Sequence, residues 1–127
     1  MSKIIIKSEQ APAPIGPYSQ AVSTGNMLFV SGQVALNPAK GEMENESIVS
    51  EATQVMKNLD AILKAAGFEW NEVVKSTIFL KDLNDFGTVN GIYGEYFKEN
   101  PPARETVEVA RLPRDAKVEI SVVAAKS

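Results

Sequence analysis

The chain has 127 residues, of which 44% are hydrophobic and 23% are charged, a composition typical of one folded domain spanning residues 1–127. Thirteen basic against sixteen acidic residues leave a net charge of −3, which disfavours nucleic acid and anionic membranes as partners. The sequence contains neither Cys nor His, which excludes disulfides, zinc sites of the usual Cys and His kind, and nucleophiles activated by histidine.

The N-terminal segment is too short to direct the chain into or across a membrane. Its apolar run is Ile4–Ile6, flanked by Lys3 and Lys7, whereas a signal peptide or a spanning helix needs a much longer apolar stretch. We therefore expect a cytoplasmic protein with no membrane partner, which also agrees with the lack of Cys.

The first third of the chain is predicted to be mostly β structure. Residues 3–7 read as an edge strand, and residues 18–23 and 27–31 as a hairpin whose turn lies at 24–26. Three prolines within residues 11–17 remove too many amide donors for a sheet, so this segment is predicted to be a stiff loop that leads to Tyr18. Residues 37–46 are polar and acidic and are predicted to be an exposed loop.

Two amphipathic helices follow. Apolar residues recur at helical spacing from residue 48 to residue 66, with Ser47 as N-cap, Gly67 as the C-terminal cap and Glu51 on the outer face. The second helix follows residues 82–85 and ends before Asn100, which precedes a proline. Its three glycines, at 87, 91 and 94, fall on one face, and close approach of another segment would explain them.

Three further strands are predicted at residues 73–80, 105–111 and 118–122, the last two separated by a turn at 112–115. The order of elements indicates an α+β domain with both helices on one face of a mixed sheet. Because the strand at 73–80 is apolar on both sides, its second face is expected to be covered by a partner chain.

Arg104 and Glu119 are the most informative charged pair. If the valines at 107 and 109 and the apolar residues of 118–122 face the core, parity places Arg104 and Glu119 together on the other face. A mismatch of about four residues would separate them by roughly 13 Å, too far for one small ligand within a single chain. A shared site would then need a neighbouring copy; the alternative is two solvated side chains.

Motifs in three parts of the chain are recognisable. They are Gly16-Pro17-Tyr18-Ser19-Gln20-Ala21 with Ser31-Gly32-Gln33; the pattern Phe86, Val89-Asn90, Tyr93 and Tyr96-Phe97; and Pro102-Ala103-Arg104, Val107, Val109, Leu112-Pro113 and Val118-Glu119-Ile120. Together they resemble the RidA (YjgF) family of reactive-intermediate deaminases over nearly the whole chain.

This resemblance implies a chorismate-mutase-like α+β fold with a mixed six-stranded sheet, two helices on one face, and a homotrimer with three sites between subunits. It implies hydrolysis of enamines and imines, such as 2-aminoacrylate and 2-iminopropanoate, to 2-oxo acids and ammonia, with no metal or organic cofactor. A non-catalytic regulatory module that binds small carboxylates is the alternative. An RNA-directed role, also attributed to this family, is disfavoured by the lack of His and by the acidic balance.

The resemblance also implies roles for individual residues. Arg104 would bind the substrate carboxylate through two parallel hydrogen bonds, which Lys could not reproduce. Glu119 would hold and help deprotonate the attacking water, and Tyr18 would assist by hydrogen bonding.

Four further residues would line the substrate. The backbone near Ser31 and Gly32 would support the ligand, and Asn90 and Thr106 would contact it. Many family members have a small residue followed by Cys after the arginine, whereas this chain has Glu105 and Thr106. This departure puts the substrate preference in question.

Overall fold

A mixed sheet with two helices on one face forms the body of the protein. The computed structural model describes residues 2–127. The strands of the sheet are β1 (Ile4–Ile6), β2 (Ala21–Thr24), β3 (Met27–Gln33), β6 (Val73–Leu80), β7 (Ala103–Glu108) and β8 (Val118–Ala125), and the helices are α1 (Ile48–Ala66) and α2 (Phe86–Gly94). Short 3-10 turns occur at η1 (Trp70–Glu72), η2 (Leu83–Asp85) and η3 (Pro113–Asp115).

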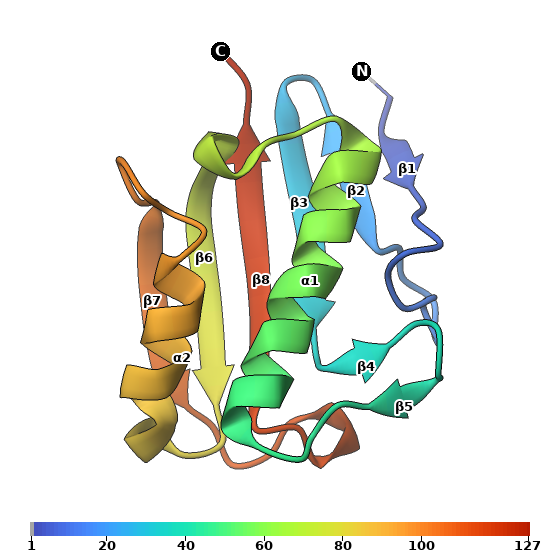
Figure 1. Ribbon diagram of the computed structural model, residues 1–127. Coiled ribbons are helices and arrows are strands. Elements are labelled where there is room, and N and C mark those ends of the chain that lie inside the picture. Colours follow the sequence, from blue (N-terminus) through green and yellow to red (C-terminus); the bar gives the residue numbers. More distant parts are fainter. Residues whose placement is uncertain (1) are drawn as a thin grey trace.

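The sheet order is β1-β2-β3-β8-β6-β7, with α1 and α2 lying side by side over the same face (Figure 1). The β6 and β7 strands are parallel, and every other pair of neighbours in this sheet is antiparallel. The predicted α+β architecture, with a mixed six-stranded sheet and two helices on one face, is therefore confirmed.

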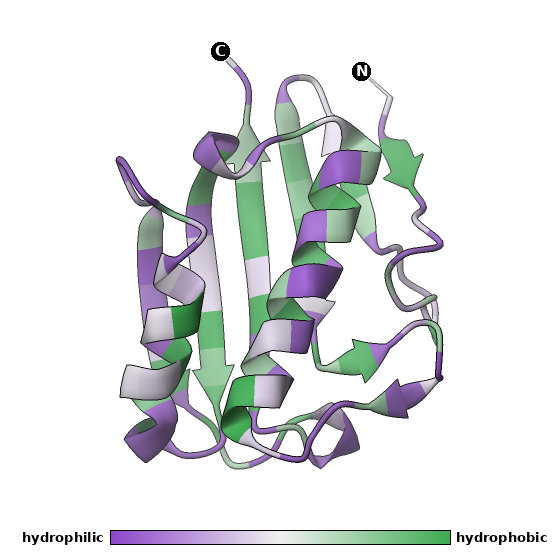
Figure 2. Ribbon diagram, in the orientation of Figure 1, coloured by the Kyte–Doolittle hydropathy of each residue, from purple (hydrophilic) through white to green (hydrophobic). Residues whose placement is uncertain are grey.

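The long helix α1 forms because its local signals agree. Ser47 is the N-cap and its side chain accepts from the Ser50 amide, while Gly67 ends the helix at φ 78°, the left-handed conformation that glycine adopts easily. The apolar stripe packs on the sheet, where Leu59 and Ile62 are fully buried. Figure 2 shows that β3 and β8 beneath it are largely hydrophobic, while hydrophilic residues recur along α1.

Glu51 does not lie on the outer face of α1 as predicted. Its side chain is 0% exposed, and one carboxylate oxygen accepts a hydrogen bond from the Lys117 amide while the other has no partner. Glu51 lies four residues before Val55, on the stripe that faces the sheet. The buried carboxylate thereby connects the residue before β8 to α1. The prediction failed because it placed Glu51 in solvent on account of its charge.

Several boundaries also differ from the prediction. The polar segment 37–46 contains part of a small hairpin, β4 (Leu36–Asn37) with β5 (Glu42–Met43), instead of a plain loop. The α2 helix ends at Gly94, earlier than predicted, and Asn100 adopts a left-handed φ of 49° before the prolines. An added Cβ at Gly87, Gly91 or Gly94 would meet nothing within 4 Å, so no segment of this chain approaches them closely.

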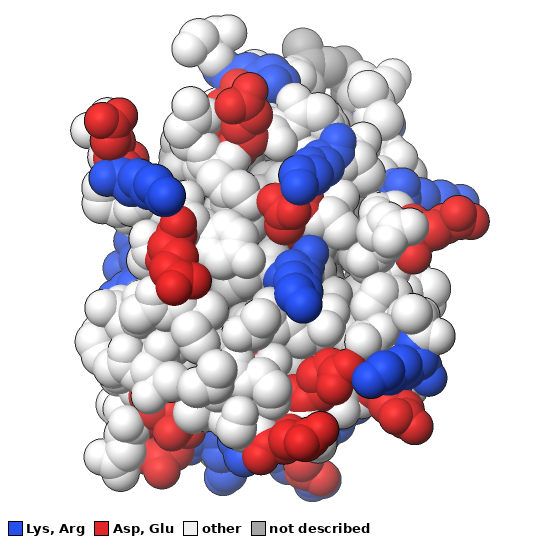
Figure 3. Space-filling view, in the orientation of Figure 1, with Lys and Arg blue, Asp and Glu red and all other residues white. Residues whose placement is uncertain are grey.

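The sheet face opposite the helices is partly apolar and uncovered in the described part of the chain. Phe29 is 47% exposed and Val107 is 43% exposed, and Val22, Phe79 and Val123 are half-buried on the same face. The helix-covered side differs, because Figure 3 shows Lys, Arg, Asp and Glu interspersed over it, with neither sign forming a continuous patch. The bare sheet face is the surface that most needs a covering partner.

Candidate functional site

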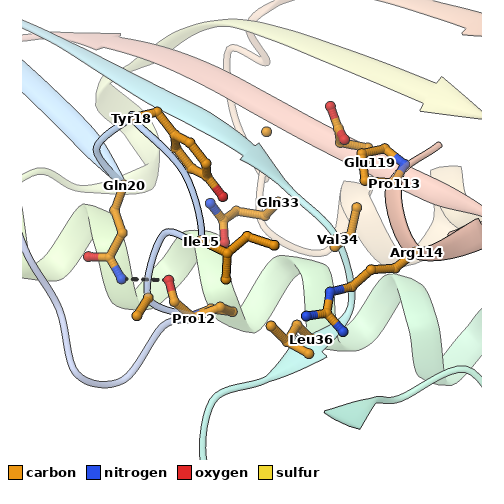
Figure 4. Close-up of a pocket in the computed structure, with 12 residues that line it drawn as sticks. Pro12, Ile15, Tyr18, Gln20, Gln33, Val34, Leu36, Pro113, Arg114 and Glu119 are labelled. Carbon is orange, nitrogen blue, oxygen red and sulfur yellow. Dashed lines mark hydrogen bonds between the residues drawn. The ribbon is translucent and has the colours of Figure 1, made fainter. Parts of the chain in front are cut away.

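A cavity of about 120 Å³ lies beside the start of β8 (Figure 4). It is lined by the proline-rich loop, the end of β3 with the residues after it, η3 and β8; the lining residues are Pro12, Ala13, Ile15, Tyr18, Gln20, Gly32, Gln33, Val34, Leu36, Pro113, Arg114 and Glu119. We call this space the Glu119 cavity. It brings together three of the predicted site residues, Tyr18, Gly32 and Glu119.

Glu119 has a carboxyl group without a protein partner. It alternates with the buried residues Val118 and Ile120, so it projects from the open face of the sheet, where it is half-buried. No ion pair or side-chain hydrogen bond joins it to any residue in the range 2–127. Burial raises the pKa of this carboxyl above its ordinary value of 4.5, because the charged form loses solvation. A base of raised pKa suits proton transfer near neutral pH.

Gly32 makes room for that carboxyl group. The pairing of β3 with β8 is irregular between Val30 and Gln33, and Gly32 lies within the irregularity. A Cβ placed on Gly32 would lie 2.8 Å from the Cδ atom of Glu119, closer than carbon atoms approach in folded proteins. The backbone at Gly32 was predicted to support a ligand; the structure shows that the missing Cβ also makes room for the Glu119 side chain.

Tyr18 belongs to the proline-rich loop and not to a strand, because β2 begins only at Ala21. Tyr18 is 53% exposed and borders the Glu119 cavity. The loop is held by the buried side chain of Gln20, whose amide nitrogen donates to the carbonyl groups of Ser8, Ala11 and Pro12. Gln20 accepts in return from the Ser8 amide at 2.6 Å. These bonds fix the backbone from which Tyr18 projects.

Ser31 also positions this loop. Its hydroxyl donates to the Ser19 carbonyl at 2.6 Å, and its amide donates to the Gln20 carbonyl at 2.9 Å. In this structure Ser31 thus holds the residue next to Tyr18, and its support of a ligand stays a prediction.

A second group of predicted residues lies at the β7 edge of the sheet, in a shallow recess under α2. The recess is lined by Ile78, Leu80, Phe86, Val89, Asn90, Arg104 and Thr106, and we call it the Arg104 recess. The Nη1 atom of Arg104 donates to Oδ1 of Asn90 at 2.7 Å. Its guanidinium also lies 5.5 Å from the ring centre of Phe86 and 5.0 Å from that of Tyr93, within range of cation–π attraction.

Two hydroxyl groups complete this recess. The Thr106 hydroxyl is buried and has no hydrogen-bond partner among the described residues. The Tyr93 hydroxyl donates to the Ser76 hydroxyl at 2.9 Å, and burial raises the pKa of Tyr93. The recess therefore holds an oriented guanidinium beside a buried hydroxyl that has no partner in the described chain.

Arg104 and Glu119 lie on opposite faces of the sheet, which corrects the prediction that they share one. Arg104 pairs with Ser76 and lies on the helix side, whereas Val107, predicted to face the core, projects from the open face. The prediction failed because it assumed that Val107 faces the core. At the edge strand β7 the Arg104 stem packs under α2 instead, and Val107 lies on the face opposite the helices.

The structure agrees that one small ligand cannot reach both side chains within one chain. Arg104 pairs with Ser76 and Glu119 pairs with Phe79, three residues farther along β6, which lies between the two strands. These offsets correspond to about 10 Å along the strands and about 10 Å across them. The predicted site residues thus form two separate groups within the chain, which we call half-sites.

Other kinds of site find little support in residues 2–127. No group of three or more Asp and Glu side chains in this range could hold a metal ion. None of the helices described is long and apolar enough to cross a membrane.

Sequence reasoning gave no role to two residues that line the Glu119 cavity, Gln20 and Arg114. Gln20 stood within a recognised motif, so the motif could have pointed to it. Arg114 had no signal in the sequence, because arginine is common in turns.

Comparison with known proteins shows the family to which the chain belongs. A family model described as Endoribonuclease L-PSP matches residues 8–126. A mouse protein named 2-iminobutanoate/2-iminopropanoate deaminase is 52% identical over 127 residues, covering 98% of this chain and 94% of the mouse protein. The chain belongs to the RidA (YjgF) family.

Other RidA relatives extend the likeness. A protein of Pyrococcus horikoshii, named only as a RutC family protein, is 50% identical over 98% of both chains. The crystal structure of Escherichia coli TdcF with bound serine has a TM-score of 0.93 and 41% identity, covering 98% of this chain and 99% of TdcF. The fold of the RidA family is thus established for this chain.

Proposed function

We propose that the protein hydrolyses reactive imines and enamines of the 2-iminobutanoate and 2-aminoacrylate kind to 2-oxo acids and ammonia. The observation on which the proposal depends is the division of the site: a fixed guanidinium in the Arg104 recess and an unpaired carboxyl of raised pKa in the Glu119 cavity. The names of the mouse and human relatives, both 2-iminobutanoate/2-iminopropanoate deaminases, support the substrate class.

The two half-sites supply complementary parts of the reaction. Arg104, oriented by Asn90, binds the substrate carboxylate through charge-assisted hydrogen bonds, and the free Thr106 hydroxyl donates to the same group. Glu119 accepts a proton from the water that attacks the C=N carbon, and Tyr18 hydrogen-bonds the water or the nitrogen. No metal or organic cofactor enters this scheme, because positioning suffices for an imine that already reacts with water.

The half-sites meet, in this proposal, between copies of the chain. The open sheet face contains exposed Phe29 and Val107, which an assembly would cover. A ring of three copies places the β7 edge of one protomer against the Glu119 cavity of the next, giving three equivalent sites. The proposal therefore includes a homotrimer with its sites at the subunit junctions.

The first test is substitution of Arg104. With 2-aminoacrylate or 2-iminobutanoate generated by a dehydratase, Arg104→Ala should lower the catalysed formation of 2-oxo acid by about 100-fold, the effect of losing two charge-assisted hydrogen bonds. Arg104→Lys should recover little of it, since an ammonium cannot form the same paired bonds. Arg111→Ala, which removes an exposed arginine paired with Asp115, is the control. An unchanged rate for Arg104→Ala would reject the mechanism.

The second test asks whether the site is shared. Arg104→Ala and Glu119→Gln protomers should each be inactive alone. In random trimers made from equal amounts, about one quarter of the junctions would combine native Arg104 and native Glu119, so activity should return to about that fraction. A site within one chain would give no recovery, and a monomer by light scattering would contradict the shared site directly.

A non-catalytic module that binds small carboxylates is the competing function. It is favoured by the TdcF structure, in which a relative holds serine, and it uses the same Arg104 recess. Saturable binding of 2-oxobutanoate without faster imine hydrolysis would establish this alternative in place of the enzyme.

A further inference from the structure

The Glu119 cavity contains a second charged side chain, Arg114, which has no role in the reaction described above. Arg114 lies in η3 and lines the cavity together with Glu119. In Figure 4 its guanidinium extends toward Leu36, whereas the Glu119 carboxyl points away from it. The cavity therefore has a carboxyl group and a guanidinium facing different parts of its lining.

Arg114 has no acidic partner among residues 2–127. Its neighbour Asp115 is engaged elsewhere, because its Oδ1 atom accepts from Nε of Arg111 at 3.0 Å. Glu119 does not neutralise Arg114 either: burial alone raises the pKa of Glu119, with no contribution from a nearby cation. The guanidinium is thus available to an anion that enters the cavity.

The turn that presents Arg114 is unusual. Arg114 and Asp115 have φ angles of 58° and 54°, left-handed values that residues other than glycine rarely adopt. Two residues after Asp115 comes Lys117, whose amide donates to the buried Glu51 carboxylate and whose carbonyl accepts from the Lys81 amide at 3.0 Å. Non-glycine residues persist in such conformations where surrounding contacts hold them, often at ligand sites.

We propose that Arg114 binds a second anionic group of the substrate, so that the protein acts on imines of acidic amino acids, such as 2-iminosuccinate and 2-iminoglutarate. This inference rests on the proposed function, in which Arg104 of a neighbouring copy takes the carboxylate next to the C=N bond. The carboxylate at the far end of the substrate then meets Arg114. A cavity of about 120 Å³ has room for about four water-sized groups, which suits a short carboxylated side chain.

The reaction itself is unchanged for these substrates. One water adds to the C=N carbon, its oxygen becomes the carbonyl oxygen, and its two protons leave with the nitrogen as ammonia. No oxidant or reductant is consumed, and the second carboxylate remains intact. Arg114 therefore sets specificity, and its contribution is expected in binding and in KM.

Calorimetric titration with the stable products tests the assignment without requiring turnover. We expect 2-oxoglutarate to bind wild-type protein more tightly than 2-oxobutanoate, and Arg114→Gln to lower the ratio of the two affinities by about tenfold. Arg111→Gln removes an arginine of the same loop that pairs with Asp115 and does not line the cavity, so it should leave the ratio unchanged.

Kinetics then connect binding to reaction. The ratio of kcat/KM for 2-iminoglutarate, generated by an amino-acid oxidase with catalase, to that for 2-iminobutanoate should fall by a similar factor in Arg114→Gln. Three results would overturn the inference. They are an equal loss of kcat/KM for both imines in Arg114→Gln, an equal change of the ratio in Arg111→Gln, and a wild-type protein that does not prefer the substrate with two carboxylates. If neither imine is hydrolysed faster but the Arg114-dependent affinity ratio is found, the proposed function fails while the anion site stands.

Discussion

The Arg104 recess and the Glu119 cavity differ in how their charged groups are held. In the recess the guanidinium is bonded to Asn90 and lies against two aromatic rings. In the cavity the carboxyl of Glu119 has no partner, and its surroundings raise its pKa. A group that must orient a substrate benefits from fixed contacts, whereas a group that must accept a proton benefits from having few.

The two regions also differ in what supports them. The recess is built from neighbouring elements, α2 and the β6–β7 pair. The cavity depends on segments far apart in the sequence, because the proline-rich loop, the irregular end of β3 and the η3 turn all border it. Changes in the cavity are therefore expected to alter reactivity more easily than changes beneath the recess, and this difference can be tested.

The largest effect is expected from Gly32→Ala. The new Cβ would lie 2.8 Å from Cδ of Glu119, so the carboxyl must move. Misplacement by about 1 Å should lower kcat/KM for 2-iminobutanoate by about 100-fold, while binding of 2-oxobutanoate at the Arg104 recess is largely kept. Gly16→Ala is the matched control, since its Cβ would make an ordinary 3.6 Å contact with the Tyr18 ring. Equal activity of the two variants would show that the position of Glu119 does not matter.

Sequence reasoning succeeded where local signals decide the structure. Ser47 and Gly67 cap α1 through contacts with the adjacent turn, so the ends of that helix could be predicted without knowing the fold. The strand at 73–80 was found with its bounds because it is rich in β-branched and apolar residues, interrupted only by Lys75 and Ser76. The hairpin of β4 and β5 was missed, since two-residue strands in a polar segment leave no periodic pattern.

Reasoning from parity failed where tertiary packing decides. Arg104 was expected on the open face because the valines at 107 and 109 were assumed to face the core, yet Val107 lies on the open face and the Arg104 stem packs under α2 at the sheet edge. Glu51 was assigned to the solvent because of its charge, although its spacing from Val55 placed it on the buried stripe. The residues of both half-sites were named from family motifs, but their division into two places required the register of β6 with β7 and β8.

A smaller effect is expected from Glu119→Gln on stability. Because burial raises the folded-state pKa above 4.5, the folded protein binds a proton more readily than the unfolded chain between these two values. The wild-type free energy of unfolding should therefore fall, relative to that of Glu119→Gln, as pH rises from 4.5 through the folded pKa, and then level off. Urea denaturation of both proteins from pH 4 to pH 8 measures the difference.

The same measurement can show whether the half-sites meet. If the guanidinium of a neighbouring copy lies near Glu119, the stability gained by Glu119→Gln should be larger in an Arg104→Ala background, because the opposite charge no longer offsets burial. If Glu119→Gln raises the free energy of unfolding equally with and without Arg104→Ala, the Arg104 guanidinium and the Glu119 carboxylate do not interact. A gain that does not depend on pH would contradict the raised pKa.

The smallest effect concerns the helix beside the recess. Gly91 lies in the interior of α2, and an added Cβ would meet nothing within 4 Å. Gly91→Ala should raise the free energy of unfolding by about 0.5–1 kcal/mol, because alanine loses less backbone entropy in a helix. Gly67→Ala, at φ 78°, should lower it and serves as the opposite control. A loss of stability or of assembly in Gly91→Ala would instead show that a neighbouring copy packs closely against α2, next to the Arg104 recess.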